Sequence, residues 1–430
     1  MKRKIKIFIN KMYHSQFARM LKSMPEFIYY SYCHKKLINE LKSTSKINIV
    51  FIISNLAMWK CQKVYDLFAQ NPKFNISLLI IPFLNYSEDQ KRENINQMIQ
   101  YFKHLNLQFE IIDDPNATGF REKYKPHIVF YPQMYGHTYP GDFDLLHNLD
   151  RLVCYVPYGL STTCNDFVYD SIGCVFAWKN FVVSEMHKEE AKHISRIRDW
   201  NVFVCGNPTA DLFTKGSFQN VWKKQNKIKK KVIIAPHFTI KPGLSGLCRS
   251  SFLDLASTFL ELTEMYKDEI QFAFKPHPRL KTELEKEDVW GKEKTAAYYS
   301  EWEKRSNTQL ETGAYIDLFM TSDAMIHDSC TFTAEYHYTS NPVLFTTLNP
   351  DGLIKSEKMG QFGEMAFRLH YFGDSKKSLI NFLNDVVLKG HDPLKVKRDT
   401  FRKDYLLSNK RISCAELIYT NICNSLGVKY

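Results

Sequence analysis

The residues best suited to chemistry lie in the segment from His327 to Thr346, which begins and ends beside apolar stretches. Residues 324–326 and 343–345 are typical of buried strands, and small polar residues follow the first of them. A helix that begins there directs its backbone N–H groups and the positive end of its dipole towards a bound phosphate. The polar residues at this predicted helix start are Ser329, Cys330, Thr331 and Thr333.

Two acidic residues, Asp328 and Glu335, bracket the same turn and are placed to hold hydroxyl groups of a ribose or a glycerol. The alternative is an ordinary strand–helix turn inside an α/β core. The local pattern favours both interpretations equally, since capped helix starts are common. A decision therefore needs a second group of residues.

That second group follows another apolar strand and occupies the segment from Gln271 to Leu280. Two prolines fix the turn after the strand and remove two N–H donors. Lys275, His277 and Arg279 then lie at the carboxyl end of a strand, where open α/β sheets bind ligands. Two cations and a histidine suit a diphosphate and a proton transfer. A lone histidine is more often structural, but the cations beside this one favour a catalytic role.

Together the two segments resemble the CDP-glycerol glycerophosphotransferase family, of the teichoic-acid polymerase type, and above all its shorter relatives from bacterial surface-polysaccharide clusters. Residues 275–278 match the family's Lys-x-His-Pro turn, and residues 326–331 align without gaps with its Ile-Thr-Asp-Tyr-Ser-Ser segment. Glu335 takes the family's acidic position, and residues 341–343 close the match. Three further segments are similar to the shorter relatives: 155–159, 206–208 and 235–237.

The resemblance implies a transferase. Such an enzyme moves glycerol phosphate, or a related alditol phosphate, from a CDP-activated donor to a hydroxyl group of a surface glycan or lipid-linked acceptor, and it releases CMP. The resemblance also implies a fold of the GT-B type, in which two Rossmann-like domains face a cleft. The substrate-binding residues that we expect are Lys275, Arg279, Asp328, Ser329, Cys330, Thr331, Glu335, Tyr158 and Gly159.

The catalytic base is expected to be His277 or His237, both at strand ends of the second half. The long polymerases carry Trp-His-Gly where this chain has Pro-Tyr-Gly at 157–159, so their histidine is missing here. This departure makes His237 the candidate substitute. We expect no metal and no cofactor besides the CDP-alditol substrate, because Asp142 and Asp144 lie in a loop with glycine and proline and only superficially resemble a metal-binding Asp-x-Asp.

Two other functions stay open. A GT-B glycosyltransferase that uses a nucleotide sugar in capsule or lipooligosaccharide synthesis would share the fold, since fold does not fix substrate. A non-enzymatic basic tether for anionic lipid or nucleic acid would explain the charge. No helix-turn-helix, RNA-binding or zinc signature accompanies that charge, so we expect no nucleic-acid partner. The sequence gives no indication of the oligomeric state.

The composition agrees with a cytoplasmic α/β enzyme of two or three domains. The chain has 430 residues, of which 44% are hydrophobic, so it can build two cores. Its ten cysteines form no Cys-x-x-Cys pair and no metal-ligand spacing, which indicates reduced thiols. The longest apolar runs, such as 76–84, are too short to span a bilayer, and the basic N-terminus lacks the apolar core of a signal peptide.

The net charge of +12 is concentrated at the N-terminus, where residues 1–46 hold eleven Lys or Arg against two Glu. Apolar residues interleave with these charges: Phe17, Leu21, Phe27, Tyr29, Tyr30, Leu37 and Leu41. One interpretation is an amphipathic element on the inner face of the cell membrane. The other, equally favoured, is a basic helical extension packed on the body of the protein.

Alternating strand and helix patterns predict two mostly parallel sheets. The predicted domains are a basic helical extension at 1–46, an acceptor-side Rossmann-like domain at 47–222, a lysine-rich linker at 223–231, a nucleotide-side Rossmann-like domain at 232–395 and C-terminal helices at 396–430. The segment 283–305 is expected to form a polar helical lobe on the surface. The predicted strands are 48–53, 76–82, 109–112, 127–131, 152–156, 181–183, 202–205, 232–235, 270–274, 324–326 and 343–345.

Overall fold

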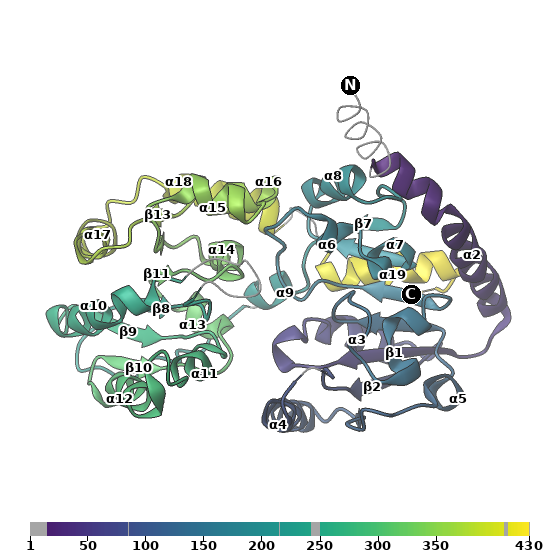
Figure 1. Ribbon diagram of the computed structural model, residues 1–430, viewed down its shortest axis with the longest axis horizontal. Coiled ribbons are helices and arrows are strands. Elements are labelled where there is room, and N and C mark those ends of the chain that lie inside the picture. The colour runs from purple at the N-terminus through teal and green to yellow at the C-terminus, as the bar shows by residue number, and fades with distance from the viewer. Residues whose placement is uncertain (1–14, 85, 215, 242–249, 408–411, 430) are drawn as a thin grey trace. The chain divides into compact units, whose positions relative to one another are not determined.

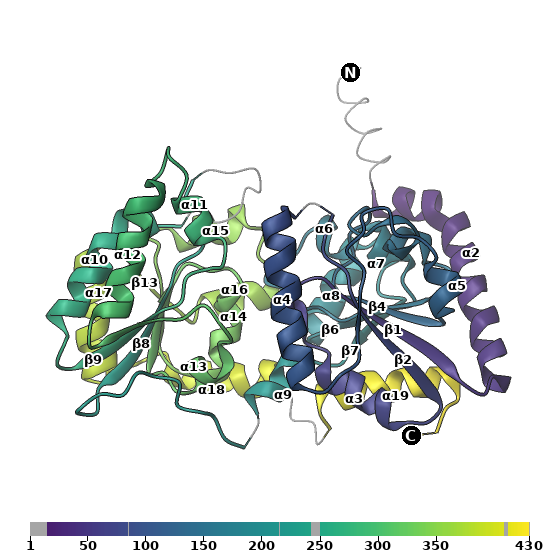
Figure 2. The ribbon, with the colours of Figure 1, turned by 90° about the horizontal axis from the view of Figure 1, so that it is seen from below.

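The computed structural model in Figure 1 describes residues 15–84, 86–214, 216–241, 250–407 and 412–429, and these residues form two compact units. Unit 1 contains the chain up to Leu160, the segment Cys164–Asp211 and the C-terminal helix. Unit 2 contains Ser161–Thr163 and the chain from Leu212 onwards, up to the segment before that helix. In each unit helices cover both faces of a parallel sheet, as Figure 2 shows, which confirms the predicted pair of Rossmann-like domains.

The sheet of unit 1 has seven strands in the order β3-β2-β1-β4-β5-β6-β7. Its strands are β1 (Ile47–Ile53), β2 (Phe74–Ile80), β3 (Glu110–Ile111), β4 (Ile128–Tyr131), β5 (Leu152–Tyr155), β6 (Lys179–Val182) and β7 (Val202–Val204). Its helices are α2 (Gln16–Ser43), α3 (Gln62–Gln70), α4 (Glu88–His104), α5 (Phe120–Tyr124), α6 (Asp166–Tyr169), α7 (Ile172–Phe176), α8 (Glu185–Ile194) and α19 (Cys414–Leu426). Short 3₁₀ turns are η1 (Leu56–Met58), η2 (Gly141–Phe143) and η3 (Leu145–His147).

Side chains of β1 alternate between two cores, because successive residues of a strand point to opposite faces of its sheet. Phe51 stacks on Phe130 of β4 at 4.4 Å between ring centroids, and the core on this face also contains Ile418 and Ile422 of α19. Val50 belongs to the core on the other face. Because both faces are buried, the strand is apolar from Ile49 to Ile53, and this apolar run predicts a strand from sequence.

The sheet of unit 2 has six strands in the order β10-β9-β8-β11-β12-β13. Its strands are β8 (Lys230–Ala235), β9 (Ile270–Phe274), β10 (Thr308–Leu310), β11 (Ala324–His327), β12 (Val343–Phe345) and β13 (Tyr371–Phe372). Its helices are α10 (Phe252–Met265), α11 (Leu280–Leu284), α12 (Gly291–Lys304), α13 (Ile316–Met320), α14 (Phe332–Glu335), α15 (Pro350–Ser356), α16 (Gln361–Phe367), α17 (Lys376–Asn381) and α18 (Lys395–Phe401). The 3₁₀ turn η4 (Tyr336–Thr339) and the π-helical turns η5 (Phe382–Leu388) and η6 (Arg402–Leu406) complete it, and α9 (Thr209–Phe213) spans the boundary between the units.

The segment 283–305 differs from the polar surface lobe that its composition predicts. Most of it is α12, whose Trp302 is fully buried and stacks on Phe274 of β9 at 4.7 Å between ring centroids. Tyr298 and Tyr299 of the same helix are also buried in the core of unit 2. Three aromatic side chains on one face therefore anchor a helix that also carries six charged residues.

Three fully buried histidines lie together in unit 2: His327, His337 and His370. His327 Nδ1 accepts the N–H of Ser329 at 3.1 Å, so its proton is on Nε2, which lies 3.1 Å from Nε2 of His370. His370 Nδ1 in turn lies 3.0 Å from the carbonyl of Phe367 and donates to it. The hydrogen bonds therefore fit neutral rings.

The lysine-rich run 223–231, which we expected to link the domains, belongs instead to unit 2. The buried Trp222 precedes it, the N–H of Lys223 donates to Gln309 Oε1 at 2.6 Å, and the run ends inside β8. The chain leaves unit 1 at Asp211, before the run begins. A cluster of lysines is typical of a solvated linker, but here their backbone is part of a folded unit.

The predicted N-terminal extension is helical over α2, and the first fourteen residues lie outside the described residues. No helix within the described ranges is long and apolar enough to cross a membrane. The cysteines that the structure describes are free thiols. The predicted C-terminal helices are present and divide between the units, with α18 in unit 2 and α19 in unit 1.

Candidate functional site

The candidate site lies in unit 2, where the carboxyl ends of β8, β9 and β11 meet at one edge of the sheet. The strand order runs outward in opposite directions from the β8–β11 pair, so this edge contains the topological switch point. In open α/β sheets the switch point is where ligands bind. His237 follows β8, the Lys275–Arg279 turn follows β9, and Asp328 follows β11.

The two histidines proposed as catalytic are neighbours. The rings of His237 and His277 are 4.8 Å apart between centroids and lie edge to face. The His277 N–H donates to the carbonyl of Pro236 at 3.0 Å, so the two strand-end turns are joined directly. His237 is buried and His277 is half-buried. Two histidines that are 40 residues apart in sequence thus lie side by side in the candidate site.

Both predicted cations belong to this cluster. The Arg279 guanidinium lies 4.1 Å from the centroid of the Phe238 ring, and Phe238 also contacts the rings of both histidines. Lys275 is buried beside them. Phe238 was not singled out by sequence reasoning, although its position next to His237 at a strand end is a usable signal.

Burial, and after it the neighbouring cations, lower the pKa values of the two histidines in this cluster. Burial lowers the pKa of His277 to about 3, and His237, Arg279 and Lys275 lower it further. Burial and then Arg279 lower the pKa of His237 to about 4. Burial lowers the pKa of Lys275 to about 8, against the opposing attraction of Glu311. The site therefore holds neutral histidines beside cations and favours the arrival of negative charge.

Hydrogen bonds distinguish the two imidazoles. His277 Nδ1 accepts the N–H of Arg279 at 3.1 Å, so the proton of neutral His277 is on Nε2. His237 Nδ1 lies 2.9 Å from Thr239 Oγ1. When His237 Nδ1 donates to that hydroxyl group, its Nε2 keeps a lone pair. His277 is thus arranged to donate a hydrogen bond, and His237 can accept a proton.

Asp328 is buried and bound by the protein itself. One carboxylate oxygen accepts the N–H of His237 at 2.6 Å, and the other accepts Ser250 Oγ at 2.6 Å and the N–H of Ser251 at 3.0 Å. Burial raises the pKa of Asp328, and these hydrogen bonds act against that rise. We expected Asp328 to hold hydroxyl groups of the donor. The geometry instead makes it a positioning residue that ties the His237 turn to the start of α10.

The predicted phosphate seat after β11 differs from its expected form. The helix that follows Cys330 is α14, which has only four residues, and Thr331 precedes it without a side-chain capping bond. So short a helix has a weak dipole, because the macrodipole is a sum over aligned peptide units. Ser329 is buried, while Cys330 is half-buried and Thr331 is exposed. The cations after β9 are therefore the stronger source of positive field.

Glu335, the last residue of α14, is fully buried. The Tyr315 hydroxyl donates to its Oε2 at 2.7 Å, and burial and then Glu335 raise the pKa of that hydroxyl well above its ordinary value. A carboxylate held in the core of unit 2 is poorly placed to meet a ligand. Direct contact between Glu335 and donor hydroxyls thus stays a prediction without geometric support.

Tyr158 and Gly159 follow β5 and belong to unit 1, whereas the His237–His277 cluster belongs to unit 2. Tyr158 is exposed. Asp142 and Asp144 are also in unit 1, where they cap local turns. Asp142 accepts the N–H of Phe120 at 2.8 Å, and Asp144 accepts the N–H of Thr138 at 2.9 Å. Within the described ranges, no group of three or more His, Cys, Asp or Glu is arranged to hold a metal ion.

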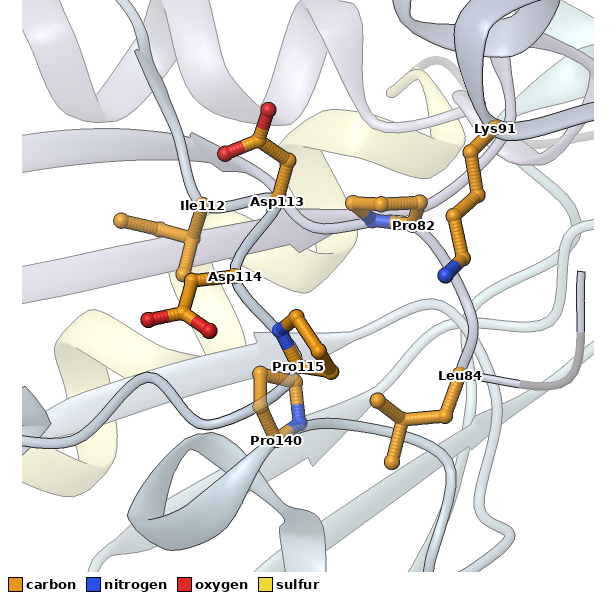
Figure 3. A pocket seen from close by; sticks show the side chains of 8 residues that line it. All are labelled: Pro82, Leu84, Lys91, Ile112, Asp113, Asp114, Pro115 and Pro140. Atoms are coloured by element: carbon orange, nitrogen blue, oxygen red, sulfur yellow. The ribbon is translucent and has the colours of Figure 1, made fainter. Parts of the chain in front are cut away.

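A small hollow lies in unit 1 beside the carboxyl ends of β2 and β3. Figure 3 shows prolines between the carboxylates of Asp113 and Asp114 on one side and the amine of Lys91 on the other. Sequence reasoning did not identify it. Its full lining is Pro82, Leu84, Lys91, Ile112, Asp113, Asp114, Pro115 and Pro140.

Comparison with known proteins establishes the fold. No protein-family model and no curated protein sequence matches the chain. A proposed UDP-N-acetylglucosamine 2-epimerase from Listeria monocytogenes aligns at a TM-score of 0.59 and 16% identity, over 89% of this chain and 96% of that one. The Neisseria meningitidis UDP-GlcNAc 2-epimerase bound to UDP-GlcNAc aligns at 0.55 and 14%, over 88% and 100%. The wall teichoic acid polymerase TagF aligns at 0.55 and 13%, over 96% and 98%. At these identities the likeness concerns the fold, and the chain has the GT-B type of architecture.

Proposed function

We propose that the protein is a transferase that moves glycerol phosphate, or a related alditol phosphate, from a CDP-activated donor to a hydroxyl group. The acceptor is a surface glycan or a lipid-linked precursor. The observation that supports this most directly is the cluster of His237, His277, Lys275 and Arg279 at the switch point of unit 2. The match of the Lys-x-His-Pro turn at 275–278 to the glycerophosphotransferase pattern favours a CDP-alditol as the donor.

In this proposal the cations bind the diphosphate of the donor. Lys275 and Arg279 supply a field that offsets its negative charge, and the Nε2–H of His277 donates to a phosphate oxygen. Bound diphosphate raises the pKa of both histidines, because an anion stabilises the imidazolium form. The low pKa values of the histidines in the protein alone therefore do not oppose proton transfer in the complex.

The reaction is a displacement at phosphorus. The acceptor oxygen bonds to the glycerol-bearing phosphorus, and the bond from this phosphorus to the bridging oxygen breaks. CMP departs with the bridging oxygen and its electron pair. The acceptor proton passes to Nε2 of His237, which we propose as the base. His277 and the cations stabilise the negative charge that develops on the leaving group.

A nucleotide-sugar transferase is the second candidate. It is favoured by the structural likeness to the epimerase whose structure contains UDP-GlcNAc, at the same TM-score as the teichoic acid polymerase. The same cations would then bind the diphosphate of a UDP- or CMP-sugar. The two candidates differ in the donor, so donor choice decides between them. We further propose that the protein acts in the cytoplasm, where nucleotide-activated donors and free thiols coexist.

The experiment is a donor panel. The purified protein is incubated with CDP-glycerol, CDP-ribitol and several nucleotide sugars, and release of CMP or of a nucleoside diphosphate is followed. CMP release from a CDP-alditol, absent in the His277→Ala variant, supports the proposal. Turnover of nucleotide sugars alone selects the second candidate. If a folded protein turns over no donor, both are excluded and the non-enzymatic tether is favoured.

A further inference from the structure

Helix α2 lies along the side of unit 1 (Figure 1), and its two faces differ in character. The inner face packs on unit 1: Leu37 and Leu41 are buried in its core, and the His34 ring is 2.8 Å from the carbonyl of Leu149. The N-terminal end is tied down by Arg19, which pairs with Asp170 at 2.9 Å. The helix is therefore held against the body along its length.

The outer face carries a row of large apolar side chains. Phe17, Leu21, Ile28 and Tyr32 are exposed by 65%, 53%, 60% and 64%. Their spacings of four, seven and four residues place them on one side of the helix. Tyr29, exposed by 57%, lies at the edge of this row. An exposed row of this length on one helix indicates a surface with a partner, since scattered single residues are the usual pattern.

The same face continues into positive charge. Lys35 and Lys36 follow the apolar row at helical spacing and are exposed, and neither forms an ion pair within the described part of the chain. Exposed Lys22 lies beside the row. The acidic side chains of α2 are Glu26 and Glu40 only. Apolar side chains next to lysines complement a surface that is anionic outside and apolar beneath.

We propose that the outer face of α2 binds an anionic membrane surface. Phe17, Leu21, Ile28 and Tyr32 enter the boundary between headgroups and acyl chains, while Lys35 and Lys36 remain at the level of the lipid phosphates. A second copy of the chain is a poorer occupant, because it presents the same positive face. The proposal does not depend on the transfer reaction, although a lipid-linked acceptor would be found at that surface.

The test is sedimentation with phosphatidylcholine vesicles that contain or lack phosphatidylglycerol. We expect binding to the anionic vesicles only, with a steep fall as salt increases. The double variant Phe17→Ser/Ile28→Ser should bind at least about ten-fold less, because the apolar burial of two large side chains is lost. Lys35→Gln and Lys36→Gln should each weaken binding about five-fold.

The matched control is Leu348→Ser/Val396→Ser, which removes two side chains exposed by 71% and 75% in unit 2 and should leave binding unchanged. Should the first double variant unfold, Leu21→Ser/Tyr32→Ser tests the same row. Unchanged binding in a folded row variant overturns the proposal. So does a dimer that the row variants dissociate, since a second copy would then cover this face.

Discussion

At the scale of residues, the site consists of two neutral histidines inside a positive field. Burial and the neighbouring cations keep His237 and His277 unprotonated at neutral pH. Their residue types and strand-end positions could be predicted from sequence. Their separate roles could not be predicted from sequence, because these roles depend on which nitrogen of His277 accepts the N–H of Arg279. That bond leaves His277 as a donor, and we propose His237 as the base.

This division predicts different responses to substitution. His237→Ala should lower turnover by about 10²–10⁴-fold, the usual effect of losing a general base. His277→Ala should lower it by about 10²–10³-fold, as for one donor to a developing anion. His277→Gln retains an N–H donor and should recover part of that loss. Turnover at saturating donor, with folding checked by circular dichroism, measures these effects.

The control is His193→Ala, since that histidine lies on the surface of unit 1 in an ion pair with Glu189. Turnover equal to wild type in His237→Ala, together with an inactive His277→Gln, would transfer the base role to His277. Near wild-type turnover in both alanine variants would show that this cluster is not catalytic.

Metal independence is a second prediction at this scale. Lys275 and Arg279 are placed to offset the charge of a diphosphate, so activity should persist in excess EDTA. Lys275→Met should weaken CDP-glycerol binding in calorimetry, because it removes a buried positive charge from the proposed diphosphate site. Activity that disappears in EDTA and returns with magnesium or manganese would contradict the prediction and restore Asp142 and Asp144 as candidate ligands.

At the scale of elements, apolar pattern located most strands, and the predicted strand 270–274 coincides with β9. The edge strands β10 and β13 were missed. The sequence of β10, Thr-Gln-Leu, has no apolar run of the kind that located the other strands. The partners of Asp328 were also missed. Ser250 is 78 residues away in sequence, and its contact arises only once β8 and β11 pair side by side.

Asp328 therefore predicts a coupled loss of stability and activity. Asp328→Asn places an amide where the carboxylate accepts N–H groups from two elements, the His237 turn and the start of α10. Leaving a buried donor unsatisfied costs about 1–3 kcal/mol in the free energy of unfolding. Urea unfolding measures that loss, and turnover should fall because the His237 turn is released.

Calorimetry with CDP-glycerol separates this role from direct contact with the donor. A variant of normal stability that binds the donor weakly would show that Asp328 holds ligand hydroxyl groups after all. Normal stability with normal binding would remove it from the site altogether. Glu335→Gln, another buried carboxylate of unit 2, is the comparison variant.

At the scale of the whole molecule, we expect the stability of the two units to respond to different changes, unit 2 to acid and unit 1 to the loss of α19. Unit 2 contains the three neighbouring histidines described above, and burial lowers the pKa of His327 and of His337 to about 3 and that of His370 well below its ordinary value. Unit 1 owes part of its core to α19, with Ile418 and Ile422 fully buried. Acid should therefore act first on unit 2, and loss of α19 on unit 1.

We predict that unit 2 loses stability as pH falls from about 6.5 towards 3. Above that window the histidines are neutral whether folded or not. Within it the unfolded chain binds protons that the folded unit excludes, at about 1.4 kcal/mol per pH unit for each histidine. The raised pKa of Asp328 acts in the opposite direction, but it is one group against five histidines of unit 2 whose pKa is lowered. Urea unfolding between pH 7.5 and 5 measures how the free energy of unfolding changes with pH. His337→Gln should reduce this slope by the contribution of one proton. An unchanged slope in that variant would refute this account.

The two cores should respond to separate substitutions. Ile422→Ala in α19 and Leu383→Ala in η5 each remove a fully buried side chain, and each should cost about 2–5 kcal/mol. Hydrogen exchange resolved along the chain should show lower protection in unit 1 for the first variant and in unit 2 for the second. Equal loss of protection in both units, for either variant, would mean that the chain unfolds as a single cooperative body.

The return of α19 to unit 1 has a consequence for synthesis on the ribosome. The strands of unit 1 are made first, yet the helix that covers Phe68 and its neighbours emerges only after the whole of unit 2. Until then one face of the first sheet lacks part of its cover, and an uncovered apolar sheet is the surface that chaperones bind and that nascent chains aggregate through. The half of the protein that is translated first is the last to be completed. Ribosome stalling within unit 2 would release a chain that quality control recognises by that face.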